Sequence, residues 1–190
     1  DGTSHTVTPG AMPVGPQTGK RPDLHGPVHQ VFYRPFCFVY DPQGSVIYKR
    51  LAANLLASWS ITGNGHGCAL PLDQVPAGFG ETTNLIFLGV APDAIPGAPT
   101  LPFDWSATEI TVEGQSYQNN ALVFVYPNGD RLHGFMVATA GAERLLYRFD
   151  PFAPFSGAPD FFLFGSDGGV ASGMFDADWQ VVPAFSSGLN

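Results

Sequence analysis

An unbroken apolar stretch from Ala121 to Tyr126 predicts a β-strand, because its valine, phenylalanine and tyrosine side chains suit a pleated surface. The next four residues, 127–130, have the sequence Pro-Asn-Gly-Asp. Asn-Gly accepts the positive φ angles of a tight hairpin turn, so we expect Arg131–Thr139 to return as the partner strand. Both faces of the first strand are apolar, which is typical of a central strand covered on both sides.

The segment Val31–Tyr40 also predicts a strand, but Pro35 lies inside it. Proline cannot donate a ladder hydrogen bond, so this strand either lies at a sheet edge or breaks at Pro35. We expect Ser45–Leu51 to pair back with it. The segment Ala52–Ile61 is ambiguous between helical turns and strand, and any helix of the chain is expected there. Alternating apolar and polar residues predict a further strand at Glu143–Phe149.

Strand-like segments recur along the rest of the chain. The chain has 18 prolines and 23 glycines but only 13% charged residues, a composition that disfavours a helical protein. We therefore predict an all-β fold, an antiparallel β-meander of about ten short strands that forms a barrel or a sandwich. Its remaining strands are expected at Leu85–Val90, Thr108–Glu113, Phe161–Phe164, Val170–Phe175 and Trp179–Val182.

Residues 1–29 differ from the rest of the chain, with five prolines, five glycines and no sustained hydrophobic period. We expect them to form an extended N-terminal tail, followed by a single β-rich domain at residues 30–190. A tail so poor in apolar residues is ordered only where something holds it. It therefore either wraps its own domain or docks on a protein partner, which includes a second copy of the chain.

The net charge of −8 gives a surface that repels phosphate groups. This charge argues against nucleic-acid binding and against anionic membranes. No apolar run approaches the roughly 18 residues needed to cross a bilayer, so no transmembrane segment is expected. The chain begins with Asp1 rather than methionine, as a processed exported protein does, and it has few lysines. We expect an extracytoplasmic protein, secreted or periplasmic.

Cys37 and Cys68 are the only cysteines of the chain. In an oxidising compartment they would form one disulfide that closes a loop of about 30 residues. The alternative is two unpaired thiols, with Cys37 buried in its strand. If the bond forms, neither cysteine is a nucleophile or a metal ligand.

Histidines supply the candidate chemistry. His66 lies in the glycine-rich segment 63–68, where it is either a surface-loop residue, a metal or ligand contact, or a catalytic acid/base. His133 follows the predicted turn and is either a strand-end residue or a pocket acid/base. His25 and His29, with His66, are the candidate metal ligands, although Gly26-Pro27 excludes a regular helical pair. Solvated tail histidines are the simpler interpretation.

The chain has 16 phenylalanines, six tyrosines and three tryptophans. Several phenylalanines cluster in a proline-broken segment, where they either form an exposed interface, line a barrel mouth or cap the core. The tryptophans are candidates for stacking on sugar rings. The predicted ligand or partner contacts are Phe149, Phe152, Phe155, Phe161, Trp59, Trp105 and Trp179.

The common nucleotide-binding and hydrolase motifs are missing from the sequence, and no cofactor is indicated. We therefore expect a non-catalytic binding or structural subunit, which associates through its tail and aromatic segment with a larger assembly or an apolar ligand. The first alternative is a β-barrel enzyme that acts on a small apolar substrate with His66 or His133 as acid/base. The second alternative is a glycan-binding module. An enzyme would need several polar groups converging on one cavity.

Overall fold

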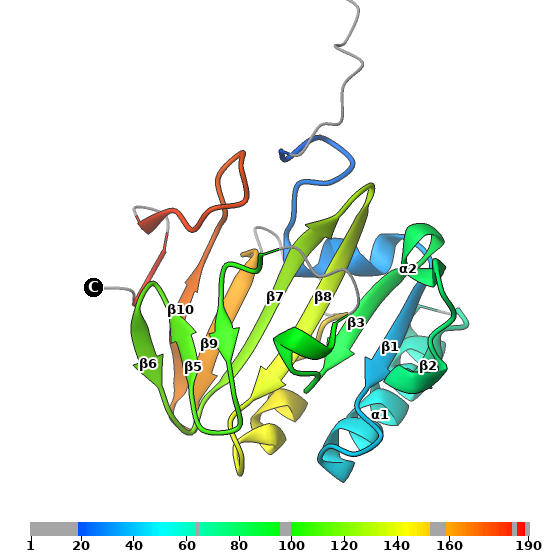
Figure 1. The fold of residues 1–190 in the computed structure, drawn as a ribbon, viewed down its shortest axis with the longest axis horizontal. Helices are drawn as coiled ribbons and strands as arrows, with labels where there is room; N and C mark the ends of the chain where they lie inside the picture. The colour runs from blue at the N-terminus through cyan, green and yellow to red at the C-terminus, as the bar shows by residue number, and fades with distance from the viewer. Residues whose placement is uncertain (1–18, 64, 96–99, 153–158, 184–185, 189–190) are drawn as a thin grey trace, which may run out of the picture.

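A computed structural model describes residues 19–63, 65–95, 100–152, 159–183 and 186–188. Its centre is a seven-stranded mixed sheet with the order β10-β9-β7-β8-β3-β1-β2, seen from left to right in Figure 1. The strands are β1 (Phe36–Tyr40), β2 (Cys68–Pro71), β3 (Asn84–Leu88), β7 (Ala121–Asn128), β8 (Arg131–Ala138), β9 (Phe161–Gly165) and β10 (Gly168–Gly173).

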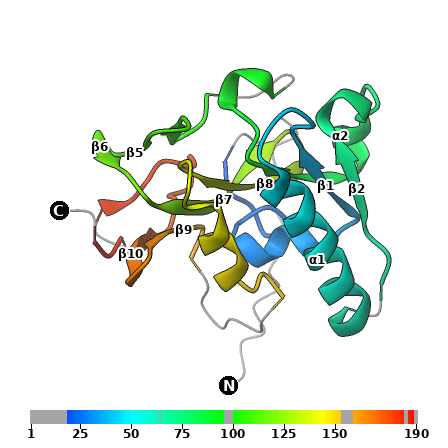
Figure 2. The ribbon, with the colours of Figure 1, turned by 90° about the horizontal axis from the view of Figure 1, so that it is seen from below.

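Different layers cover the two faces of this sheet (Figure 2). One face carries α1 (Val46–Thr62) together with the 3-10 helices η1 (Val28–Tyr33) and η4 (Glu143–Arg148). The other face carries a three-stranded sheet of β4 (Asp104–Trp105), β5 (Ile110–Val112) and β6 (Gln115–Tyr117). Three short helices complete the described elements: η2 (Leu72–Gln74), α2 (Phe79–Thr82) and η3 (Pro92–Ala94).

The antiparallel half of the sheet confirms the predicted central hairpin. β7 pairs with β8 on one side and with β9 on the other, and Ala121–Val125 is buried. The two connecting residues are Gly129 and Asp130, one position later than expected, and Gly129 takes a φ of 59°. Phe124 and Phe135 stack across the hairpin with their ring centroids 4.4 Å apart. Stacked aromatic rings on a cross-strand pair stabilise both strands and their register.

The other half of the sheet corrects the prediction of an antiparallel meander. β1 pairs parallel with both β2 and β3, and β3 pairs parallel with β8. Parallel neighbours need a crossover connection, and α1 supplies it between β1 and β2. The fold is mostly β, but the barrel does not close, because β10 and β2 are the two outer strands. The small sheet covering the large one is nearer to the predicted sandwich than to a barrel.

Helix α1 replaces the strand that was expected at Ser45–Leu51, while the helical alternative for Ala52–Ile61 is confirmed. The Ser45 side chain caps the helix by accepting a hydrogen bond from the backbone N–H of Ile47, at 3.4 Å. The buried positions follow the helical spacing of three and four residues that buries one face. They are Tyr48, Leu51, Ala52 and Leu55.

The strand predicted at Glu143–Phe149 is also wrong, since this segment forms the 3-10 helix η4. The buried residue of η4 is Leu146, and η4 packs against β7 and β8 on the face of the sheet that also carries α1. The predicted break at Pro35 is confirmed, because η1 precedes it and β1 follows it. β1 is nevertheless an inner strand between β3 and β2.

The remaining strand predictions correspond to β3, β5, β9 and β10 with shifted ends. The exception is Trp179–Val182, where the structure has only an isolated bridge between Phe175 and Val181. Trp179 there is fully buried, so the segment contributes to the core rather than to a sheet.

Residues 19–29, the second part of the expected tail, pack against the domain. Leu24 and Val28 are buried, and the Lys20 backbone N–H donates to the Ala177 carbonyl at 2.7 Å. The Lys20 ammonium also pairs with the fully buried carboxylate of Asp160. We call residues 19–27 the N-terminal arm; residues 1–18 lie outside the described part of the chain. The helices of the described ranges are all too short or too polar to cross a membrane.

Candidate functional site

An apolar groove with a volume of about 400 Å³ lies between the end of η4 and the β9–β10 hairpin. Its polar rim consists of Arg148, Ser172 and Ser187. Its apolar lining comes from the chain after η4 and from the two strands. The lining residues are Phe149, Phe162, Leu163, Phe164, Val170 and Ala171.

The alternation of β9 creates this groove. Phe161 and Leu163 point into the core and are fully buried, whereas Phe162 and Phe164 are half-buried on the opposite face of the strand. On that face η4 packs on β7 and β8, and α1 packs on β1. The helices therefore leave the β9–β10 end of the sheet open, as Figure 2 shows. Phe149 covers one side of the opening with its ring centroid 5.6 Å from that of Phe162.

Polar contacts hold the rim of the groove in place. The Arg148 guanidinium donates to the Ser166 carbonyl at 2.7 Å, which fixes it beside the β9–β10 turn. The Ser172 and Ser187 hydroxyls lie 3.1 Å apart, and their backbones form a bridge. Val170, at a bulge of β10, lines the groove and remains exposed. The groove therefore has apolar walls and a rim that donates and accepts hydrogen bonds.

Of the predicted phenylalanine contacts that lie in the described part of the chain, only Phe149 lines this groove. Phe161 lies in the core, where its ring packs against Phe103 and Phe175. Phe152 packs on Phe32 on the helical side of the sheet. Phe155 lies outside the described residues.

The three tryptophans lie in three separate surroundings. Trp179 is 1% exposed, which removes it from any surface that binds a partner. Trp59 packs edge-on to Phe36. Trp105 donates its indole N–H to the Val90 carbonyl at 3.0 Å. None of the three cavities, which are the apolar groove and two others, is lined by a tryptophan.

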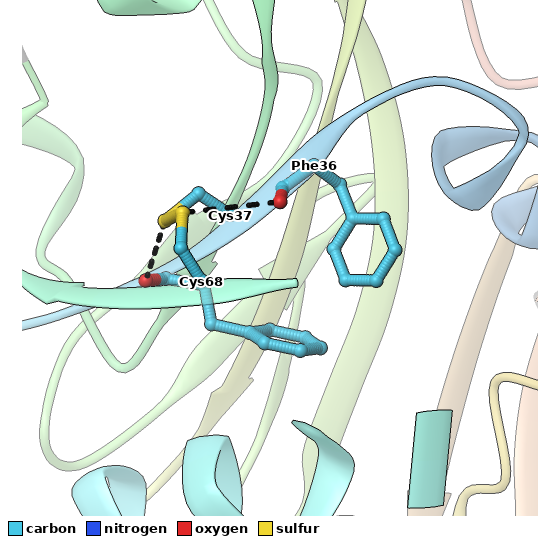
Figure 3. Close-up of a disulfide and its surroundings, with 4 residues drawn as sticks. Phe36, Cys37 and Cys68 are labelled. Atoms are coloured by element: carbon cyan, nitrogen blue, oxygen red, sulfur yellow. Dashed lines mark hydrogen bonds between the residues drawn. A yellow bond between two sulfur atoms is a disulfide. The ribbon is translucent and has the colours of Figure 1, made fainter. Parts of the chain in front are cut away.

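The predicted disulfide between Cys37 and Cys68 is confirmed. It joins directly opposed residues of the parallel strands β1 and β2, with a Cα–Cα distance of 4.7 Å, beside Phe36 (Figure 3). Cys37 is fully buried. Because both sulfur atoms are bonded, neither cysteine is a nucleophile or a metal ligand in this structure.

The candidate metal histidines do not meet in one cluster. His66 is exposed on the loop after α1. His25 contacts the Pro22 carbonyl and Gln30, while His29 packs on the Tyr33 ring, and burial together with the nearby His25 lowers the pKa of His29. The described residues contain no group of three or more His, Cys, Asp or Glu side chains placed to hold a metal ion.

His133 lines a second cavity, of about 340 Å³, which we call the histidine cleft. It lies between β3, β8 and residues 72–81. The ring is 6% exposed, lies edge-on to Phe87 and places Nε2 3.2 Å from the Asn128 side-chain amide. The amide N–H donates to Nε2 when the imidazole proton is on Nδ1.

Burial lowers the pKa of His133 to about 4, so the ring is neutral at pH 7. A neutral imidazole with so low a pKa is a poor base and supplies no acidic proton near neutrality. The hydrogen-bond partner of the ring is an amide rather than a carboxylate. His133 and His66 also lie on different elements, and only His133 lines the cleft.

Phe162 and Phe164 line the groove but are not among the contacts predicted from the sequence. The signal that identifies them is the alternation of β9, in which every second residue faces away from the core.

No model of a known protein family, no curated protein and no solved structure matches this chain.

Proposed function

We propose that the protein is a non-catalytic binding subunit whose apolar groove receives an apolar segment of a partner protein. The observation that supports this function is the group of half-buried aromatic side chains, Phe149, Phe162 and Phe164, around the exposed Val170. Aromatic residues are enriched at protein interfaces, and transferring one phenylalanine or leucine side chain of a partner into such a groove contributes roughly 1.5–3 kcal/mol.

The shape of the groove favours a protein segment over a small apolar ligand. Small-molecule sites enclose most of their ligand, whereas Val170 in this groove remains exposed to solvent. Its rim supplies the Arg148 guanidinium and the serine hydroxyls, which suit backbone carbonyls and an acidic side chain next to the apolar anchor. A small molecule bound there would keep one side in water, so a peptide segment is the better fit to the groove.

An extracytoplasmic location is part of the proposal. The supporting observation is the disulfide between Cys37 and Cys68, because disulfides persist mainly in oxidising compartments. A fixed β1–β2 pair also suits a protein that must keep its fold outside the cell.

The enzyme alternative has less support. Its best residue, His133, is neutral at pH 7, and its ring hydrogen bond is to the Asn128 amide. A catalytic cavity needs several polar groups around the reacting atoms. For the tryptophan-based glycan module, the burial of Trp179 and the separation of the other two tryptophans provide no shared surface.

Selection of random peptides displayed on phage tests the function directly. We expect wild-type protein to enrich peptides with aromatic or aliphatic anchors. The variant Val170→Asp places a charge in the lining of the groove and should lose these peptides, because burying a carboxylate without a partner is unfavourable. The matched control is Ile61→Asp, on the exposed end of α1, which should retain them.

Two outcomes contradict the proposal: wild-type protein enriches no apolar peptides, or Val170→Asp binds them as well as wild type does. Native mass spectrometry of the purified protein is a second test, which asks whether a small molecule occupies the groove. A co-purifying apolar compound that is lost in Val170→Asp would replace the peptide with a small-molecule ligand.

A further inference from the structure

A third cavity differs in character from the two described above. It measures about 270 Å³ and lies between the N-terminal arm, η1 and the start of β3, with Leu132 of β8. We call it the polar pocket. Its lining mixes hydrogen-bonding and aromatic side chains, namely Asp23, His25, Gln30, Tyr33, Arg34 and Asn84.

Asn84 is the most buried polar residue that lines this pocket. The residue is 1% exposed, and its side-chain N–H donates to the Val31 carbonyl at 2.7 Å. This hydrogen bond fixes the amide orientation, so Oδ1 is the free end. Oδ1 is buried and has no hydrogen-bond partner among the described residues. Buried acceptors are rarely left unpaired, so a bound group that donates an N–H or O–H here is favourable.

The walls of the pocket are held by hydrogen bonds. The Gln30 side-chain oxygen accepts from the His25 backbone N–H at 3.0 Å, so its amide nitrogen faces the His25 ring. The Arg34 guanidinium donates to the Asp130 carbonyl at 3.0 Å and to the Asp23 carboxylate at 3.2 Å. Rigid polar groups of this kind orient a ligand without losing much side-chain freedom.

The charges around the pocket balance. Arg21 and Arg34 are positive, and Asp23 and Asp130 are negative, with Arg21 2.6 Å from Asp130 and 2.9 Å from Asp23. A charged ligand would gain little net attraction from such a cluster and would lose its hydration. The pocket therefore suits a neutral ligand that both donates and accepts hydrogen bonds.

Tyr33 stands at the rim of the pocket. It is 70% exposed, and its ring contacts His29 with centroids 5.3 Å apart. An exposed aromatic ring offers a flat apolar surface with a polar tip. The C–H face of a sugar ring packs on such a surface while the sugar hydroxyls remain free for hydrogen bonds.

We propose that the polar pocket binds one neutral sugar unit, with a sugar hydroxyl donating to Asn84 Oδ1 and the sugar ring packed on Tyr33. In the same position, other hydroxyl groups of the sugar accept hydrogen bonds from the side-chain N–H groups of Arg34 and Gln30. An apolar ligand would leave Asn84 Oδ1 unpaired, and a phosphate group would lie against the Asp23 carboxylate. This site lies apart from the apolar groove and does not depend on its partner.

Nuclear magnetic resonance titration of the isotope-labelled full chain tests the site. The probes are D-glucose, D-galactose and N-acetyl-D-glucosamine, each with its methyl glycoside, added to tens of millimolar. We expect at least one of them to shift the signals of the Asn84 side-chain amide and the Tyr33 ring. If the methyl glycoside binds as tightly as its free sugar, the natural ligand is the terminal unit of a glycan. If only the free sugar binds, the natural ligand is a monosaccharide.

The variant Tyr33→Ala should weaken that binding by about tenfold, because it removes the packing surface while the exposed position leaves the fold intact. The matched control is Tyr147→Ala on η4, a second exposed tyrosine that lines none of the described pockets. It should bind the sugar as wild type does. The proposal is overturned if none of the six probes shifts Asn84 or Tyr33, or if Tyr33→Ala binds with unchanged affinity.

Discussion

The ion pair between Lys20 and Asp160 gives the most demanding test of the fold. Asp160 is fully buried, and its Oδ2 accepts from the Lys20 ammonium and from the Phe175 backbone N–H, the latter at 2.7 Å. The Lys20 ammonium lies 5.1 Å from the centre of the Trp179 ring, where a cation and an aromatic face attract each other. The two charges therefore neutralise each other only when the N-terminal arm packs in this position.

Replacing Lys20 with methionine keeps most of the apolar stem but leaves the Asp160 carboxylate buried without its counter-ion. Removing one partner of a buried pair typically lowers the free energy of unfolding by about 3–5 kcal/mol, a large part of the about 5–15 kcal/mol that stabilises a domain. An exposed ion pair would contribute at most about 1 kcal/mol. The burial of Asp160 therefore decides which magnitude applies.

Urea unfolding at pH 7, followed by tryptophan fluorescence, measures this loss. The control Lys49→Met changes an exposed lysine of α1 and should alter the free energy of unfolding by less than about 0.5 kcal/mol. In the background of Asp160→Asn, where the buried charge is gone, Lys20→Met should have a much smaller effect. A loss below about 1 kcal/mol for Lys20→Met would refute the buried ion pair.

Three further predictions concern the sheet and its surroundings. The double variant Cys37→Ala/Cys68→Ala, which opens a loop with a sequence separation of 31, should lose about 3–4 kcal/mol in urea unfolding, and an unchanged midpoint would contradict a stabilising disulfide. The folded pKa of His133 is about 4, below the ordinary value of 6.5, so the unfolded chain binds the extra proton first. The contribution of His133 to the free energy of unfolding is therefore fully present above pH 6.5, and about 3 kcal/mol of it is lost as the pH falls towards 4. In His133→Gln, the urea midpoint should fall less steeply over this pH range than in wild type. Gly89→Ala should cost roughly 2–4 kcal/mol, because its φ is +64° and the added Cβ would lie 2.1 Å from the Tyr48 ring; a thermal melt like that of wild type would contradict this packing.

The parts of the fold that sequence predicted are those encoded by neighbouring residues. The Asn128-Gly129 sequence predicted the β7–β8 hairpin to within one position, since Gly129 and Asp130 connect the strands, and the apolar run before it predicted a central strand. Pro35 ends η1 and opens β1 in the same local way. These features need no knowledge of distant parts of the chain.

The errors arose where tertiary packing overrides local preference. Val46, Ile47 and Tyr48 favour strands individually, but Ser45 caps a helix there and the buried face of α1 packs on the sheet. The parallel pairing of β1 with β3 is also not visible locally, since an apolar strand is compatible with either direction. Because residues 45–51 were predicted as a strand that pairs back with its neighbour, the crossover helix that makes β1 and β2 parallel was not predicted.

The candidate sites show the same limit. The alternation of β9 predicts that Phe162 and Phe164 face one side, but not that η4 leaves that side open. Asn84 and Tyr33 meet in the polar pocket from distant parts of the chain, and Asn84 lies just before the strand that was predicted at Leu85–Val90. Its significance is the unpaired buried oxygen, which only the packed structure reveals.

The two outer strands of the large sheet have a consequence for how copies of this chain meet. Unpaired strand edges are templates for sheet-to-sheet aggregation. Here β2 is only four residues long and ends with Pro71, which cannot donate to a further strand. The opposite strand, β10, has a bulge near Val170 and is bridged by Ser187. Both edges thus oppose the addition of another strand, which is the step by which sheets of separate copies would join into fibres.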